Sequence, residues 1–473
     1  MNRYPLCYAN DNDALIPEIW AQESLAILEE NMVMANLVHR DFSPLVASYG
    51  DVVNTRRPSE FETRRKSQSD SVENQDAQST NVQVPLNQHV YVTFTIKDEE
   101  ASLSFKELIQ YYMQPAAMQM ARTVDRVLVG QVHEFLDNKA GKLGGISSST
   151  AKDYVLDTRK VLNDNNAYPN GRNLVVSTDI ETEMLKTELF IAADQRGDMG
   201  TALEEARLGR ILGFDVYMDQ NAKAIALSGA DTNTLNHTAG ASAGDTGNKA
   251  VTSATEVTNG EYVWFTGDQQ PQVISAHTGS GSTTGITLVD AYKYAVSANA
   301  VGYAFNAATV DLAGHTSANS SITAYGAGYD KKIRIDGMTA NKKVVQGQLL
   351  AHGTGTSRKV YTVIQVESVN TTCCYVWLDR PLEAAWANND NVFPGPHGSM
   401  GLAFHRDALA LVNRPLALPN QSLGVQAAVG SYNNLAMRVA MQYDISSQGT
   451  KVTLDMLMGV KVLDEDLGCV MLG

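Results

Sequence analysis

Residues 51–136 combine an alternating polar ribbon with a long amphipathic stretch, and this combination constrains the fold more than any other part of the chain. From Val90 to Ile96 apolar and polar side chains alternate, which is the period of a half-buried strand. The run Asp51–Thr55 is its expected partner, and a polar tip that reaches Thr80 separates the two. Because an isolated two-stranded ribbon is marginal in water, we expect another part of the structure to support it.

The polar tip carries five clustered basic side chains, which are Arg56, Arg57, Arg64, Arg65 and Lys66. A second copy of the chain could satisfy these charges and the open edges of the ribbon, through ion pairs or strand addition. A flexible surface hairpin with solvated arginines explains the same residues. The sequence leaves both interpretations open.

A helical stretch follows the ribbon. Ser104–Glu107 matches the S-x-x-E capping box, so a helix is expected to begin near Phe105. Pro115 forces a kink or a restart, after which apolar residues recur at helical spacing to Leu136. The second piece is long enough to span and organise a domain, although an ordinary long core helix has the same periodicity.

The segments before and after the middle of the chain predict mixed α and β structure. The expected helices cover residues 17–35 and 151–162, and a further helix begins at Thr178–Asp179. The expected strands cover residues 174–176, 211–218, 437–444 and 451–463. The strand at 211–218 is expected to return to the same sheet as the one at 174–176.

The composition changes between Ala226 and Met400, where Gly, Ser, Thr and Asn replace the helix formers. Only 23 of these 175 residues are charged, about 13%, against 19% for the whole chain. Low charge with frequent Val, Tyr and Thr argues for folded β structure and against disorder. The strand candidates are residues 261–265, 285–289, 332–335, 360–366 and 374–378. We expect an inserted β-rich domain, with a second lobe where the loop-like tract 235–255 divides it.

Length and composition limit the class of protein. A chain of 473 residues is long enough for two or three domains, and 44% apolar residues is ordinary for a globular protein. No run of eighteen apolar residues offers a membrane span, and Met1–Asp11 lacks the apolar block of a secretory signal. We therefore expect a soluble protein that folds in the compartment where it is made. The cysteines lack metal-ligand spacing and are expected to be reduced thiols; they are Cys7, Cys373, Cys374 and Cys469.

The net charge of −15 argues against general affinity for nucleic acid, because phosphate binding depends on surplus lysine and arginine. It is compatible with a container for nucleic acid. An acidic inner wall would leave enclosed DNA free to move.

The sequence offers little catalytic chemistry. It contains no H-E-x-x-H, P-loop, G-x-S-x-G or C-x-x-C spacing, and its nine histidines are scattered. His405, Arg406 and Asp407 are consecutive, but three polar residues at the entry to an apolar run are more typical of a cap or an interface. We therefore expect no enzymatic activity, no cofactor and no metal site.

The order of the segments resembles a known family. The stretches that carry the resemblance are Ala14–Ala21 at the front, Gly50–Val53 at the opening of the loop, Gly209–Val216, and Ala403–Ala408 after the insertion. With the helical arm, extended loop, long helix and closing strands, they resemble the major capsid protein of tailed double-stranded DNA bacteriophages. The similar branch of this Hong-Kong-97-type fold carries an inserted β-barrel. The likeness covers residues 14–222 and 402–470, and the order of the segments is its specific part.

The resemblance implies an α+β fold in five parts. These are an N-terminal arm (1–50), an extended β loop (51–103), a spine helix with the first part of the peripheral and axial domains (104–225), an inserted all-β domain (226–400), and the closing strands of the axial and peripheral domains (401–473). The insertion exceeds a single small barrel, and its extra part, about 235–320, has no assignment by analogy.

The resemblance also implies partners and a location. Axial domains in that family meet around five- and six-fold centres, so the chain would form hexamers and pentamers of an icosahedral shell. The shell would enclose double-stranded DNA without sequence-specific binding, in a virion assembled in the host cytoplasm and not in a membrane. Scaffolding protein, portal and decoration protein are the implied partners. Covalent cross-linking through a loop lysine occurs in some members and is not carried over to Lys66.

We therefore expect a structural shell protein that self-associates through many repeated contacts, with the five basic tip residues as one contact between subunits. The alternative is a carbohydrate-binding or surface adhesion protein. Its motivation is a set of aromatic residues in the Gly/Ser/Thr-rich β segment, which are Tyr262, Trp264, Tyr292 and Tyr294. Shell size, host and the need for a separate scaffold do not follow from the sequence.

Overall fold

The computed structural model describes residues 17–41, 52–56, 63–66, 68, 71–72, 74–75, 81–97, 112–192, 208–222, 232–312, 324–328, 332–338, 344–370, 372–395, 398–419, 424–432, 435–446 and 448–473. Its fold mixes α and β structure, with few helices and many strands. The chain forms two compact units, Met1–Val124 with Leu409–Asp464 and Asp125–Ala408 with Glu465–Gly473. We call them the first and the second unit.

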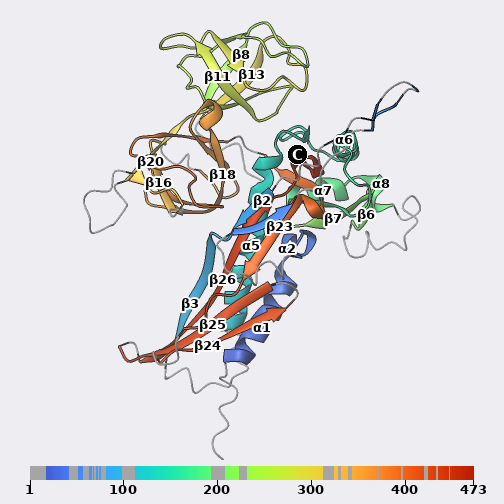
Figure 1. The fold of residues 1–473 in the computed structure, drawn as a ribbon. Coiled ribbons are helices and arrows are strands. Elements are labelled where there is room, and N and C mark those ends of the chain that lie inside the picture. Colours follow the sequence, from blue (N-terminus) through green and yellow to red (C-terminus); the bar gives the residue numbers. More distant parts are fainter. Residues whose placement is uncertain are drawn as a thin grey trace, which may run out of the picture. The chain divides into compact units, whose positions relative to one another are not determined.

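A five-stranded antiparallel sheet forms the centre of the first unit (Figure 1). Its strands are β3 (Gln88–Lys97), β23 (Leu409–Arg414), β24 (Gln426–Tyr432), β25 (Leu435–Asp444) and β26 (Gly449–Val462). The longest strand, β26, pairs with β3, β23 and β25, and β24 adds to the far side of β25. The predicted strands 437–444 and 451–463 are therefore confirmed.

One face of this sheet is apolar and packs against helix α1 (Pro17–Asn31). Val452 and Leu454 of β26 are buried, and their cross-strand partners on β3 are Phe94 and Val92. The backbone of Gly430 on β24 lies so close to α1 that a Cβ there would meet the carbonyl oxygen of Ala21 at 2.9 Å. Any larger residue at position 430 would push the helix away from the sheet.

The predicted N-terminal helix, residues 17–35, is shorter than expected. Helix α1 ends at Asn31, and a separate turn, α2 (Met34–Leu37), follows after a break at Met32 and Val33. Asn36 Nδ2 donates to the carbonyl oxygen of Met32 at 2.7 Å, so a side chain takes over a main-chain acceptor near the break. Such side-chain bonds compete with helix continuation.

The ribbon pairs differently from the sequence prediction. Strand β1 (Val52–Arg56) pairs with β2 (Asn81–Pro85), and β3 pairs with β26 instead of with 51–55. The prediction of alternation along β3 is confirmed, but the predicted partner was wrong. A periodic pattern defines which side chains share a face, and any strand with a matching apolar row can complete it.

The base of the ribbon has apolar support. Val53 of β1 and Val84 of β2 are buried together with Ala410 and Val412 of β23. The ribbon is thus anchored on the sheet of its own chain at its base, and the marginal stability expected of an isolated hairpin applies only to residues beyond this anchor.

The long helix α5 (Gln114–Gly130) continues as the 3₁₀ helix η4 (Gln131–Phe135). This agrees with the predicted helical piece from Pro115 onward, although its last turn is tighter than an α-helix. The helix start predicted near Phe105 lies outside the described residues.

A six-stranded mixed sheet forms the first part of the second unit. Its order is β4 (Lys139–Gly141), β27 (Gly468–Leu472), β22 (Met400–His405), β5 (Arg172–Val176), β7 (Phe214–Met218) and β6 (Arg210–Ile211). The parallel pairing of β5 with β7 confirms that the strand at 211–218 returns to the sheet of 174–176. Every residue of β5 is buried, which explains why Leu174, Val175 and Val176 form an apolar run without alternation.

Helices α6 (Ala151–Asp164), α7 (Thr178–Leu185) and α8 (Glu188–Ile191) accompany this sheet. The predicted helix 151–162 is confirmed. The cap of α7 is one residue earlier than predicted, because the hydroxyl of Ser177 accepts the hydrogen bond from Ile180 N at 3.5 Å. Ser177 is fully buried, so this cap satisfies a donor that water cannot reach.

Two closed six-stranded barrels complete the second unit (Figure 1). The first barrel contains β8 (Thr232–His237), β9 (Lys249–Thr252), β10 (Tyr262–Phe265), β11 (Gln272–Thr278), β12 (Gly285–Leu288) and β13 (Ala300–Phe305). The second contains β14 (Ala308–Val310), β16 (Lys332–Asp336), β17 (Leu349–His352), β18 (Lys359–Ser368), β19 (Cys374–Leu378) and β21 (Asn391–Pro394). A short pair, β15 (Ala324–Tyr325) and β20 (Trp386–Ala387), lies beside the second barrel.

Both barrels lie inside the range 226–400 predicted to be β-rich, and all five strand candidates there are confirmed. The tract 235–255 was wrongly predicted to be a loop, since it contains most of β8 and all of β9. In β8 only Leu235 is a buried aliphatic residue. A barrel strand with a single apolar anchor gives almost no alternating signal.

A buried carboxylate joins the second barrel to the end of α5. Asp379 is fully buried and accepts hydrogen bonds from Thr362 N at 2.9 Å and from Gln131 Nε2 at 3.1 Å. Arg380 Nη1 lies 3.0 Å from the same carboxylate. Thr362 Oγ1 also donates to the carbonyl oxygen of Gly130 at 2.6 Å. These bonds fix the barrel to the last turn of the helix.

Replacing Asp379 by alanine should destabilise the second barrel by about 3–5 kcal/mol, because it leaves Arg380 and Gln131 without their buried acceptor. Hydrogen exchange of the β18 and β19 amides would measure this locally. The matched control is Glu367→Ala, which removes an exposed carboxylate from an ion pair with Lys332 and should cost less than about 1 kcal/mol. Equal losses for the two variants would contradict the assigned role of Asp379.

Candidate interaction surfaces

The second face of the five-stranded sheet carries polar and aromatic side chains. Tyr91 on β3 is 64% exposed, and its cross-strand neighbour Asp455 is buried beside Arg438. The guanidinium of Arg438 binds both carboxylate oxygens, with Nε 3.0 Å from Oδ1 and Nη2 2.5 Å from Oδ2. Bidentate pairs of this kind are among the stronger charge-assisted contacts. They hold this face in a fixed arrangement.

The same face is reinforced along β3. Thr93 Oγ1 lies 3.0 Å from Thr453 Oγ1 across the β3–β26 ladder, and His89 Nε2 lies 3.6 Å from Asp455 Oδ2. A flat, ordered face with one exposed tyrosine is the type of surface on which a partner protein can pack with little loss of side-chain entropy.

The edges of this sheet are open within the described part of the chain. Strand β24 pairs only with β25, and β3 pairs only with β26. Natural proteins protect edge strands with lysine, proline or bulges, yet the seven residues of β24 include no charged residue and no proline. An unprotected edge of this length is suited to pairing with another strand.

The hairpin between β25 and β26 exposes an apolar side chain on an ordered turn. Ile445 is 83% exposed and Tyr443 is 51% exposed. Asp444 accepts from Ser446 N at 2.9 Å and pairs with Lys451, and the ion pair with Lys451 holds the pKa of Asp444 far below its usual value. The charge of Asp444 therefore stabilises the turn at all ordinary pH values, and Ile445 is presented to solvent by a defined structure.

The structure describes part of the predicted basic tip. Arg56 ends β1 opposite Asn81, and Arg57 lies outside the described residues. Arg64, Arg65 and Lys66 are exposed. Their contact with another subunit stays a prediction.

The aromatic residues that motivated the adhesion alternative do not form an exposed platform. Tyr262, Trp264 and Tyr292 are all at most 7% exposed. Tyr292 belongs to the core of the first barrel, and Tyr262 and Trp264 pack between the two barrels. Tyr294 is half-buried below Lys142, whose Nζ is 4.5 Å from the ring centroid. The alternative thus loses the observation on which it was based.

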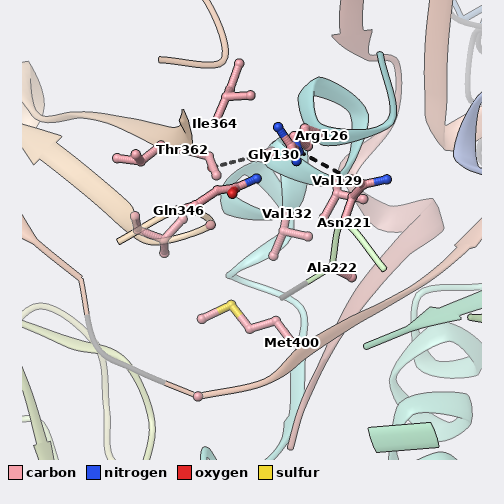
Figure 2. Close-up of a pocket in the computed structure, with 14 residues that line it drawn as sticks. Arg126, Val129, Gly130, Val132, Asn221, Ala222, Gln346, Thr362, Ile364 and Met400 are labelled. Carbon is pink, nitrogen blue, oxygen red and sulfur yellow. Dashed lines mark hydrogen bonds between the residues drawn. The ribbon is translucent and has the colours of Figure 1, made fainter. Parts of the chain in front are cut away.

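The pocket that the described residues form in the second unit is small (Figure 2). It lies between the end of α5 and strands β17 and β18, and its interior volume is about 40 Å³. Arg126 Nε donates to Asn221 Oδ1 at 3.3 Å on one side, and Thr362 closes the other side by its bond to Gly130. This volume suits one or two water molecules, and the pocket is part of the junction around Thr362.

The remaining reactive residues have structural surroundings. His405 Nδ1 accepts from Asp407 N at 3.3 Å where β22 ends, which fits the predicted cap. Cys373, Cys374 and Cys469 are free and buried, in agreement with the predicted reduced thiols. Burial raises the pKa of Cys469 to about 12. Within the described ranges, no group of three His, Cys, Asp or Glu side chains is placed to hold a metal ion.

The helices in the described part of the chain include none that is both long and apolar enough to cross a membrane.

No protein-family model and no curated protein matches the chain. Among solved structures it is similar to one titled "Mycobacterium phage Che8", with a TM-score of 0.42 and 13% identity over 93% of this chain and 90% of the other. It is also similar to "Capsid structure of the Cyanophage P-SCSP1u", with a TM-score of 0.39 and 10% identity over 90% and 84% of the two chains. A third is "Asymmetric unit of bacteriophage PhiM1 mature capsid", with a TM-score of 0.37 and 9% identity over 90% and 82%.

These titles name phages and phage capsids. TM-scores below 0.5 do not establish a shared fold. The proposal of function therefore rests on the surfaces of the chain itself.

We expect assembly to fail when all five basic tip residues, Arg56, Arg57, Arg64, Arg65 and Lys66, are replaced by serine. The subunit should stay folded, because exposed charges contribute little to the stability of one chain. Analytical ultracentrifugation would measure assembly, and circular dichroism would measure folding. The matched control replaces three exposed charged residues elsewhere, Lys152, Asp153 and Lys160 on α6, by serine. Normal assemblies from the tip variant would show that the basic tip is not a contact between subunits.

Proposed function

We propose that this chain is a major capsid protein, a subunit that self-assembles into the icosahedral shell of a tailed double-stranded DNA bacteriophage. The observation that carries the proposal is the edge of β24, an uncharged strand that pairs with no second strand among the described residues. A monomeric protein with such an edge risks uncontrolled pairing, whereas a shell subunit pairs it with a neighbour. The role is structural and not enzymatic.

Several surfaces of the first unit support repeated association. The β24 edge, the face around Tyr91 and the turn at Ile445 differ in chemistry, so a neighbour can contact each in a different way. An individual exposed contact contributes only about 0–1 kcal/mol. A closed shell repeats each contact in every subunit, and the sum favours assembly while single contacts stay reversible.

The family architecture can be mapped onto the two units as part of this proposal. The first unit corresponds to the peripheral domain, with residues 51–103 as the extended loop. The spine helix is α5, which begins in the first unit and ends in the second. The six-stranded sheet of the second unit corresponds to the axial domain, which would surround the five- and six-fold centres. The two barrels form the insertion, and residues 1–50 form the N-terminal arm.

The proposed partners follow from this role. Copies of the chain form hexamers and pentamers, and scaffolding protein, portal and decoration protein are the further partners. The virion is the proposed location, with assembly in the host cytoplasm. The net charge of −15 favours an interior that encloses DNA without binding it tightly.

The direct test is electron microscopy of the purified protein, expressed alone and together with any scaffold encoded beside its gene. Uniform closed shells are the expected result. Monomers under both conditions would contradict the proposal.

Lysine in place of Ala427 should reduce shell yield at least tenfold. Ala427 lies on β24 opposite Ala440, on the open face of the sheet, and a lysine there places a charge on the strand edge. Because Ala427 is only half-buried and faces another alanine across the ladder, the change in folding free energy should stay near the ~0.5 kcal/mol typical of surface positions.

Ala427→Ser is the matched control, since it changes the same position and keeps the edge uncharged. It should form shells at the normal yield. A shell yield from Ala427→Lys equal to that of the wild type would show that the β24 edge is not an assembly contact.

A further inference from the structure

The two barrels are docked on each other by an apolar junction. Tyr262, Trp264 and Phe305 of the first barrel pack against Ala351 and Phe393 of the second. The chain passes between the barrels through residues 306–307 only. With so short a connection and a shared apolar cluster, the two barrels have one preferred arrangement as long as this junction stays dry.

Arg358 reinforces the junction from the second barrel. Its guanidinium lies 4.6 Å from the ring centroid of Tyr262 and 5.6 Å from that of Phe393. Its Nη1 donates to the carbonyl oxygen of Gly260 at 2.5 Å. Both rings accept a cation over their faces, so Arg358 bridges the two barrels without an ion pair to a carboxylate of the described residues.

Glu261 lies between Gly260 and Tyr262, inside this junction. It is 3% exposed, and its Oε1 accepts a hydrogen bond at 3.1 Å from the main-chain nitrogen of Ala307, which belongs to the connection between the barrels. Its Oε2 is buried and has no hydrogen-bond partner among the described residues. The main chain and side chain of Thr258 also interact with this carboxyl and lower its pKa. One side chain therefore holds the connecting segment to the first barrel.

The charged groups around Glu261 do not neutralise it. His277 on β11 is the titratable group whose field acts on this carboxyl, but its ring already binds Glu256 at 2.9 Å and Asn259 at 2.8 Å. Within the described residues, no ion pair joins Arg358 to Glu261. Burial thus outweighs the neighbouring charges and hydrogen bonds, and raises the pKa of Glu261 to about 7.

We propose that Glu261 is a proton-dependent latch between the two barrels, closed when its carboxyl is neutral and weakened when the carboxyl is ionised. A neutral carboxyl can stay in an apolar junction, because only a polar group is buried. An ionised one needs water or a cation, and the junction must open to supply either.

The direction of the pH dependence follows from linkage. The closed junction raises the pKa of Glu261 above its ordinary value of 4.5, so the closed form binds its proton more tightly than the open form. Closure is strongest below pH 4.5, weakens as the pH rises, and has lost this contribution once the pH exceeds about 7. The effect requires no change elsewhere in the chain.

Hydrogen exchange of the unassembled, full-length protein between pH 5 and pH 8 tests the proposal. After correction for the intrinsic pH dependence of exchange, amides in 258–263 and 303–308 should lose protection by tenfold or more at the higher pH. Amides of β5, in the six-stranded sheet, serve as the internal reference and should not change. Equal protection of the junction at both pH values in the wild-type protein would overturn the proposal.

Glu261→Gln separates the carboxyl from other causes. Glutamine keeps an oxygen that can accept from Ala307 N and cannot ionise, so the junction should keep the same protection at both pH values. Glu367→Gln, the same change at an exposed position of β18, should retain the wild-type pH dependence. A pH dependence in Glu261→Gln equal to that of the wild type would assign the effect to another group. If Glu261→Gln does not fold, equal protection of the wild-type junction at both pH values would still overturn the proposal.

Discussion

The pairing of β3 with β26 is the constraint on which the first unit depends. It joins residues 88–97 to residues 449–458 through ten register pairs. The same ladder aligns Phe94 with Val452 on the buried face and Thr93 with Thr453 on the open face. Without it, β26 would still pair with β25, but the buried face would lose one complete row of apolar side chains. The face around Tyr91 that is proposed for association exists because this distant pairing adds β3 to the sheet.

Much of the fold could be predicted where the chain has a strong local period. Helix α6, the run 174–176 of β5 and the two closing strands of the first unit have clear apolar patterns, and the structure confirms each. The low charge and β-forming composition of 226–400 predicted a β-rich insertion. The partner of β3 could not be predicted, because alternation in Val90–Ile96 is satisfied by any strand with a matching face. The first barrel was partly missed, since β8 and β9 expose Thr, Asn and Ala instead of alternating with a larger apolar set.

The candidate interaction surfaces could also be predicted from the sequence only in part. The basic cluster at residues 64–66 was visible as a run of charge, whereas the open edge of β24 depends on which strands lack a second partner. A sequence can reveal that Gln426–Tyr432 is uncharged, but only the sheet order shows that it is an edge. Glu261 gave no signal at all, because a single glutamate at the start of a strand is normally exposed. Its burial follows from the docking of the second barrel, a contact between segments with no shared motif.

The order of the segments also has a consequence for synthesis. Each barrel uses a continuous stretch of chain and can close as soon as its last strand has left the ribosome. Strand β3 must wait for β26, whose first residue follows Lys97 by 352 positions. At the usual ~5–20 residues per second, β3 stays unpaired for roughly 20–70 s. Nascent chains on one messenger RNA therefore carry unpaired β3 strands close together. The two barrels fold during this interval, in which β3 can pair with a strand of another chain.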